Sequence, residues 1–216
     1  MYQTQRPPYG TAVVSTQSLL AQVLGITASG FLITAVAGYL TRGVPYGASL
    51  IAMLVGFGFL IAISATRANP GLSLLMFYAF TACEGVGLGS VIANYAQVDG
   101  SGVVVNAAAT TGLGMLVLAA VVWMTSFDFR KLAGLAFGML IGLVIVGLIV
   151  MFTHWLHPQL YSWATLVVFS LLVLVDFGRI RAGGSGATAV QLATSIYLDA
   201  INIFMALLRI FGRARD

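Results

Sequence analysis

Charged residues are scarce in this chain of 216 residues. Only 7% of them are Asp, Glu, Lys or Arg, whereas 60% are hydrophobic. A soluble domain has about a quarter of its residues charged, so this chain lacks the polar groups needed to cover a surface that faces water. The composition therefore excludes a water-soluble globular fold and predicts an integral membrane protein.

Cysteine and lysine are almost absent, and no basic cluster is present. The single cysteine, Cys83, excludes a disulfide framework within the chain. The single lysine, Lys131, lies between two apolar runs, so the last helix offers no Schiff-base lysine for a retinal protein. The basic residues outnumber the acidic ones, but they stand singly or in pairs, which excludes a nucleic-acid-binding surface.

Long apolar runs make up most of the chain. A helix needs roughly 20 apolar residues to cross a bilayer, and seven runs of this kind are separated by short turns. Short turns make neighbouring helices antiparallel, so we predict an all-α bundle of seven transmembrane helices with no soluble domain. The predicted spans are 19–40, 47–66, 72–93, 103–125, 132–152, 160–177 and 187–211, in a domain of residues 19–212 between a cytoplasmic N-terminal tail (1–18) and a short C-terminal tail (213–216).

The basic residues also predict an orientation, because cytoplasmic loops are enriched in Lys and Arg. With the N-terminus in the cytoplasm, Arg42 is the one basic residue of the outside loops, and Arg67, Lys131 and Arg179 fall inside. The C-terminal arginines do not follow this rule, so whether the last segment crosses fully or is re-entrant stays open. No targeting segment is recognisable, which favours a bacterial inner (plasma) membrane.

A glycine repeat occurs in the fifth predicted span. Gly134, Gly138 and Gly142 follow one another at every fourth residue, a spacing that lets helix backbones approach closely in lipid. We interpret this repeat as general helix packing rather than as a specific dimer face.

Three acidic residues lie inside predicted spans: Glu84, Asp176 and Asp199. An acid at the bilayer centre costs at least about 2.5 kcal/mol, so each one is a candidate functional residue. In the last span, polar residues recur at intervals of three and four and share one face, which must be turned to protein or water. This pattern predicts that the last helix lies at the centre of the bundle. The polar stripe consists of Gln191, Ser195, Asp199, Asn202, Ala206 and Arg209.

Asp176 and Asp199 belong to consecutive helices and are candidates for a pH-sensing gate. Two neighbouring carboxylates in a low-dielectric site do not both ionise cheaply. A protonated pair would join the two helices, whereas an ionised pair would attract a cation such as Ca²⁺, which prefers carboxylate oxygens. Their depths differ by roughly 10 Å unless the sixth helix continues past Arg179 or the seventh begins after Ala187. Contact between the two aspartates therefore stays open.

Four more residues are candidates around this pair. Ser195 and Asn202 belong to the polar stripe and are candidates for an ion path. Glu84 is either a ligand of that path or a protonated packing residue. Arg67 ends the second span, where it is a candidate gate partner of Asp176, although anchoring by the positive-inside rule explains it equally well.

The last span also carries a family resemblance. Its residues 195–204, SIYLDAINIF, followed by LLRIFG at 207–212, are similar to the C-terminal signature of the Bax inhibitor-1 family, also called the transmembrane Bax inhibitor motif family, in a bacterial-type member. The segment TSFDF at 125–129 and LAG at 132–134 resemble the family's loop between its fourth and fifth helices.

The resemblance implies a seven-helix bundle whose last helix is enclosed by the other six. It also implies a pH-sensitive calcium leak that depends on an aspartate pair, which maps to Asp176 and Asp199, with Arg67 as their partner in the closed form. This chain differs from some members of the family in lacking an acid in its second span. Its loop at 181–184 is also atypical. Other members interact with membrane proteases, which makes such a protease a candidate partner.

Enzyme and metal-site readings are less favoured. Gly183–Gly186 matches the Gly-x-Ser-Gly of intramembrane serine proteases, but His154 and His157 lie near the opposite membrane face. Both aspartates lack the flanking motifs of intramembrane aspartyl proteases. The two histidines at i, i+3 are a candidate metal pair, although an interfacial loop explains them better. We expect no enzyme activity and no cofactor.

Two functions remain from the sequence. The first is a pH-sensitive calcium (cation) leak channel gated by Asp176 and Asp199, with the lipid bilayer, Ca²⁺ and protons as its partners. The alternative is a non-conducting membrane regulator that binds other membrane proteins such as a quality-control protease.

Overall fold

The structure is a computed structural model that describes residues 15–153 and 156–213. Most of the predicted N-terminal tail, the C-terminal tail beyond Arg213, and His154 of the candidate metal pair lie outside the described residues. The tail boundaries and that metal pair therefore stay predictions.

The described residues form seven long helices and one short 3-10 helix, with each predicted span inside or close to one helix. All seven long segments are apolar and long enough to cross a membrane, which confirms the all-α, seven-helix prediction. The elements are α1 (Thr16–Leu40), α2 (Tyr46–Ala65), α3 (Pro70–Val98), α4 (Ser101–Met124), η1 (Phe129–Leu132), α5 (Ala133–Thr153), α6 (Pro158–Arg181) and α7 (Ala189–Arg213).

Side-chain caps explain where several helices begin. The Ser15 hydroxyl accepts from the backbone N–H of Ser18, and the Asn69 side chain accepts from the N–H of Leu72 at the start of α3. The His157 side chain accepts from the N–H of Gln159 at the start of α6, where Pro158 follows as the first helical residue. These groups satisfy N–H donors that the first helical turn leaves without partners.

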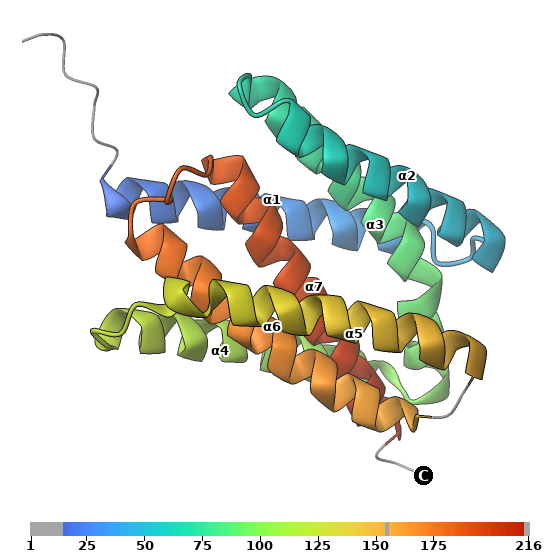
Figure 1. The fold of residues 1–216 in the computed structure, drawn as a ribbon. Coiled ribbons are helices and arrows are strands. Elements are labelled where there is room, and N and C mark those ends of the chain that lie inside the picture. The colour runs from blue at the N-terminus through green and yellow to red at the C-terminus, as the bar shows by residue number, and fades with distance from the viewer. Residues whose placement is uncertain (1–14, 154–155, 214–216) are drawn as a thin grey trace, which may run out of the picture.

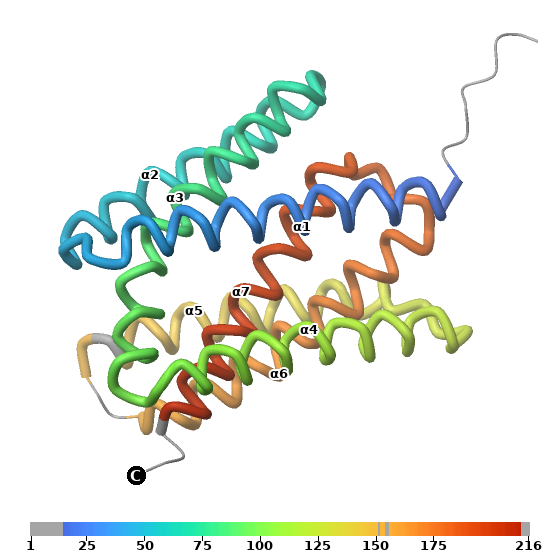
Figure 2. The backbone as a smooth tube through the Cα atoms, turned by 180° about the vertical axis from the view of Figure 1, so that it is seen from behind, coloured from blue at the N-terminus to red at the C-terminus, as the bar shows by residue number. Residues whose placement is uncertain are grey.

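Helix α7 runs diagonally through the middle of the bundle (Figures 1 and 2). It packs against α1, α2, α3, α4 and α6, and none of its residues from Ala189 to Gly212 is exposed. The predicted central position of the last helix is therefore confirmed. Helix α5 packs mainly against α6 and η1, so the central helix is surrounded chiefly by five of the other six.

Helices α1 and α3 approach each other at glycines. A Cβ added to Gly85 would lie 2.5 Å from the carbonyl oxygen of Thr34, and one added to Gly89 would lie 2.5 Å from that of Gly38. Real Cβ atoms do not come so close to a backbone oxygen, so these positions admit only glycine without a shift of the two helices.

The glycine repeat of α5 does not have the packing role that we predicted for it. A Cβ on Gly134, Gly138 or Gly142 would meet no atom of the described residues within 4 Å, and all three glycines are exposed. The interpretation was wrong because α5 lies at the edge of the bundle with this face turned outward. The close backbone approach occurs instead between α1 and α3.

Gly89→Ala is expected to destabilise the bundle by about 1–3 kcal/mol, because the added methyl group forces α1 and α3 apart. Thermal unfolding of the purified protein in detergent micelles measures the effect. Gly138→Ala is the matched control, since the same methyl group meets open space there and alanine favours a helix. Equal melting temperatures for the two variants would contradict the assigned contact.

Candidate functional site

The candidate site lies where the end of α6 meets the first half of α7. Helix α6 continues past Arg179 to Arg181, and α7 begins at Ala189. Both conditions that the sequence set for bringing the two aspartates to one level are therefore met. The connection turns sharply because Gly183, Gly184 and Gly186 have positive φ angles, which glycine adopts without strain.

Asp176 and Asp199 are both buried, with 6% and 5% of their surfaces exposed. The charge of Asp176 acts on Asp199, and the Ser195 hydroxyl lies within hydrogen-bonding reach of the Asp176 carboxylate. Three predicted site residues thus lie together, contributed by two antiparallel helices. Their role as a gate stays a prediction at this point.

Arg179 is the cation that pairs with Asp176. One of its guanidinium nitrogens donates to Oδ1 of Asp176 at 3.1 Å, across one turn of α6. The predicted partner, Arg67, instead lines a polar cavity next to this pair, and no ion pair to Arg67 occurs within the described residues. The sequence contained a signal for Arg179 in the i, i+3 spacing of an acid and an arginine, but we assigned Arg179 only to membrane orientation.

The second oxygen of Asp199 is an unsatisfied polar atom. Oδ2 is buried, and no hydrogen-bond donor within the described residues reaches it. Buried polar groups are nearly always hydrogen-bonded, and leaving one without a partner costs about 1–3 kcal/mol. A proton, a water molecule or a cation would remove this cost, so the atom marks a place where the protein can take up one of them.

The polar stripe of α7 continues on both sides of Asp199. Gln191 and Ser195 line the polar cavity, whereas Asn202 donates to the carbonyl of Leu198 at 2.8 Å and Arg209 donates to that of Met205 at 2.9 Å. Asn202 and Arg209 thus bond within their own helix. Asn202 is half-buried and shares the face of Asp199, so its place in an ion path stays a prediction.

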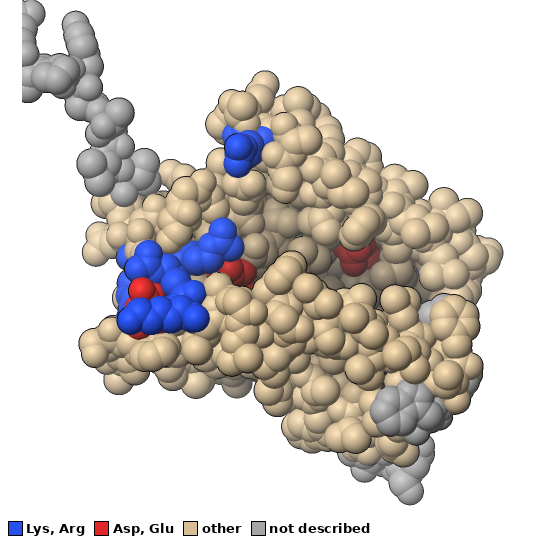
Figure 3. Space-filling model, viewed as in Figure 1, with Lys and Arg blue, Asp and Glu red and all other residues tan. Residues whose placement is uncertain are grey.

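Glu84 lies apart from the aspartates, on α3. It is half-buried, and its Oε1 would be 3.8 Å from a Cβ placed on Gly56 of α2. It is also close enough to α7 for its charge to act on Tyr197. Figure 3 shows acidic atoms at the base of a hollow in this face of the molecule, and other acidic atoms beside the basic side chains at one end. The predicted role of Glu84 in an ion path is untested.

Tyr197 attaches the site helix to its neighbours, which sequence reasoning missed. Its fully buried hydroxyl lies 2.6 Å from that of Thr34 on α1. Three rings, those of Phe31, Phe77 and Phe80, surround its own ring at centroid distances of 5.0–5.8 Å. The available signal was an aromatic residue with a polar tip two positions before Asp199, since a buried tyrosine hydroxyl needs a partner.

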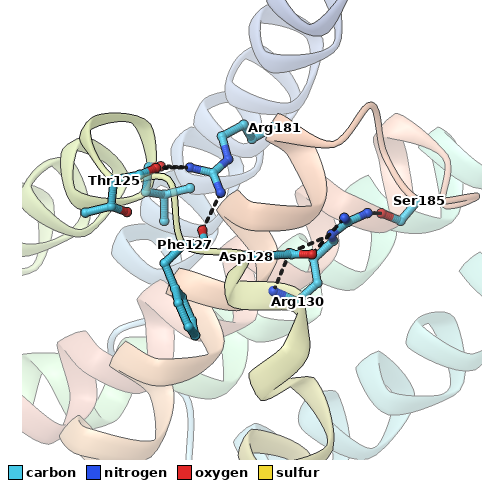
Figure 4. Close-up of polar contacts among 7 residues, drawn as sticks. Thr125, Phe127, Asp128, Arg130, Arg181 and Ser185 are labelled. Carbon is cyan, nitrogen blue, oxygen red and sulfur yellow. Dashed lines mark hydrogen bonds and ion pairs between the residues drawn. The ribbon is translucent and has the colours of Figure 1, made fainter.

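Two loops are bonded together next to the site, as Figure 4 shows. The Arg181 guanidinium donates to the carbonyls of Val122, Thr125 and Phe127 at the end of α4. Arg130 pairs with Asp128 at 2.8 Å and also reaches the Ser185 hydroxyl at 3.4 Å. Arg181, which we assigned only to the cytoplasmic basic residues and to an atypical loop, therefore donates to carbonyls that the end of α4 leaves without helical donors, and to one in the loop after it.

Comparisons with known proteins agree with this architecture. A family model described as inhibitor of apoptosis-promoting Bax1 matches residues 16–216. An uncharacterized membrane protein of Streptococcus pyogenes serotype M1 is 32% identical over 78% of this chain and 74% of its own. An uncharacterized membrane protein of Vibrio cholerae is 27% identical over 92% of this chain and 91% of its own.

Asp128 lies outside the spans, and the direction in which its contribution to stability changes with pH can be derived. Hydrogen bonds from the Arg130 side chain lower the pKa of Asp128 from its ordinary 3.8 to about 2. The stability that this carboxylate contributes is fully present above the ordinary pKa and is lost as the pH falls through the lower one.

Asp128→Asn is therefore expected to lower the melting temperature by the same amount at every pH between about 5 and 8, with the difference shrinking below about pH 4. Melting curves of both proteins across this range measure it. A difference that varies between about pH 5 and 8 would show that Asp128 titrates there, contrary to the ion pair described.

Proposed function

Since the chain belongs to the Bax inhibitor-1 family, we propose that it is a pH-sensitive calcium (cation) leak channel gated by Asp176 and Asp199. The observation that carries the proposal is the buried Oδ2 atom of Asp199, which has no donor among the described residues and lies beside a second buried carboxylate. A structural hydrogen-bond network would satisfy this atom, whereas a binding site for protons or cations would leave it available.

The proposed gate has two states. With one proton held between them, Asp176 and Asp199 can hydrogen-bond and keep α6 and α7 together. Without that proton the two negative charges repel each other and attract a cation. Arg179, paired with Asp176 at 3.1 Å, balances one charge, so the pair responds as a unit with Arg179 rather than as two independent acids.

Calcium is the cation that this chemistry favours. Ca²⁺ is a hard ion that takes six to eight oxygen ligands. Within the described residues no group of three or more His, Cys, Asp and Glu side chains could hold a metal ion. Two carboxylates and the Ser195 hydroxyl would therefore hold Ca²⁺ only in part, with water as the remaining ligands. Incomplete coordination suits an ion that passes through and does not stay.

The proposed localisation is a bacterial inner membrane with the N-terminus in the cytoplasm. Basic side chains gather at one end of the molecule, around the loops that follow α4 and α6 (Figure 3). By the positive-inside rule this end lies on the cytoplasmic side. The polar cavity beside Asp176 would then open toward the cytoplasm.

Calcium flux into liposomes tests the gate. We expect the reconstituted protein to conduct Ca²⁺ with a pH midpoint between about 6 and 8, and Asp199→Asn or Asp176→Asn to abolish that dependence or move its midpoint by about one pH unit, equivalent to about 1.4 kcal/mol. Asp128→Asn is the matched control, because it makes the same chemical change outside the spans.

Two results would contradict the proposal. Conduction that keeps its pH midpoint in both Asp176→Asn and Asp199→Asn would remove the aspartate pair as the gate. Absence of flux above empty liposomes at every pH would favour the non-conducting regulator instead. Deletion of residues 1–18 would then be expected to abolish binding to a partner membrane protein.

Substituting each of the two arginines near the aspartate pair shows which of them acts on the gate. Arg179→Gln is expected to change the pH midpoint of Ca²⁺ flux more than Arg67→Gln does, because Arg179 is the residue in contact with Asp176. Both substitutions remove one positive charge from the same cavity, so each is a control for the other. An effect of Arg67→Gln alone would show that the ion pair exchanges partners between states.

A further inference from the structure

A polar cavity of about 410 Å³ lies beside the aspartate pair, and the proposed gate assigns no ligand to it. Its wall combines the end of α2, the end of α6, the glycine-rich loop and the first turns of α7. Two arginines, Arg67 and Arg179, border it together with the hydroxyl-bearing residues Ser185, Thr194 and Ser195 and the amide of Gln191.

The cavity has an excess of positive charge. Arg179 donates through one nitrogen to Asp176, which leaves other guanidinium donors unassigned, and Arg67 makes no ion pair within the described residues. A third arginine, Arg130, reaches Ser185 at the cavity wall but is paired with Asp128. Of the two arginines that line the cavity, Arg179 thus pairs with one acid, Asp176, and Arg67 pairs with none among the described residues.

We propose that this cavity binds an anion of the phosphate class through Arg67 and Arg179. The planar guanidinium group matches two oxygens of a phosphate with parallel hydrogen bonds. The Ser185 hydroxyl accepts from Arg130, so its own proton is available as a further donor. The Thr194 hydroxyl already donates to the carbonyl of Val190. The volume is within the range of about 300–1,000 Å³ usual for small-molecule sites, so a phosphate group attached to a larger molecule also fits.

The arginines, rather than the N-terminal end of α7, recognise the anion. The first turn of α7 is already capped, because the Gln191 side chain accepts from the N–H of Thr188 at 3.0 Å and the Thr188 hydroxyl accepts from the N–H of Gln191 at 3.2 Å. The binding site consequently depends on Arg67, in the turn after α2, and on Arg179 of α6. Substitution can remove these side chains without disturbing that cap.

A bound anion and the Asp176 carboxylate would both accept hydrogen bonds from the guanidinium group of Arg179. An anion that draws guanidinium donors away weakens the hold on Asp176 and thereby alters the gate, a consequence that rests on the proposed channel function. The binding itself does not rest on it, because it needs only the cavity and its two arginines.

Binding is measured on the full-length protein in nanodiscs of phosphatidylcholine, with inorganic phosphate as the first probe and calorimetry as the readout. A second set of discs includes phosphatidic acid, and its readout is the shift in melting temperature. We expect saturable binding of at least one probe, weakened about tenfold or more in Arg67→Gln and in Arg179→Gln. Arg67→Lys is expected to be intermediate, because it keeps the charge but loses the planar fork.

Arg42→Gln is the matched control, since Arg42 stacks on Tyr39 in the loop before α2, away from the cavity. Binding of inorganic phosphate assigns a soluble phosphate compound, and a response to phosphatidic acid alone assigns a lipid headgroup. Either result supports the site. Arg67 is exposed, so Arg67→Gln decides the test if Arg179→Gln does not fold.

The proposal is overturned if neither probe binds, or if Arg42→Gln loses as much affinity as Arg67→Gln. These outcomes are independent of calcium flux. A protein that conducts Ca²⁺ but binds no phosphate contradicts only this inference, and one that binds phosphate without conducting contradicts only the channel.

Discussion

Lipid offers no hydrogen bonds to a polar side chain, and α7 carries polar side chains on one face from Gln191 to Arg209. This helix therefore needs protein on its polar side, and the arrangement of the other helices follows from that requirement. Five helices pack against it, while α5, which is apolar up to its last residue, lies outside with Gly134, Gly138 and Gly142 exposed. The helix with a continuous polar face thus becomes the most buried span, the reverse of the order in a water-soluble protein.

Because α7 is enclosed by protein, two opposite sides of the helix have different surroundings at the same depth: one is packed with aromatic rings and the other holds a carboxylate. Successive helical residues are about 100° apart, so Tyr197 and Asp199 point in nearly opposite directions. Tyr197 is bonded to Thr34 and surrounded by three aromatic rings from α1 and α3. Asp199 lies close enough to Asp176 of α6 for the two charges to interact, and it keeps one oxygen without a donor in the described structure. The packed side holds the helix in place, so the carboxylate side cannot relax to satisfy that oxygen.

Sequence reasoning succeeded where one physical rule dominates and failed where several side chains compete. Hydropathy alone predicts seven spans, and the spacing of polar residues alone places the last helix at the centre, because burial from lipid decides both. The partner of Asp176 depends on rotamers: Arg67 and Arg179 both border the same cavity, and only coordinates show that Arg179 makes the contact. The prediction that the α5 glycines pack against another helix was wrong for a similar reason, because a small-residue repeat does not reveal which face of its helix meets a neighbour.

The contacts around the cavity also restrict how it can open. On one side, Arg181 donates to three carbonyls at the end of α4 and in the loop after it, and Arg130 reaches Ser185. The end of α6 and its following loop are thereby joined to the loop before α5. On the other side, α2 is followed directly by the turn that holds Arg67, and it packs chiefly against α3, with few contacts to α7. A movement of α2 relative to α7 would open the cavity and preserve these loop contacts. Such a movement changes the distance between Arg67 and Arg179, the two groups to which an anion in the cavity would bind.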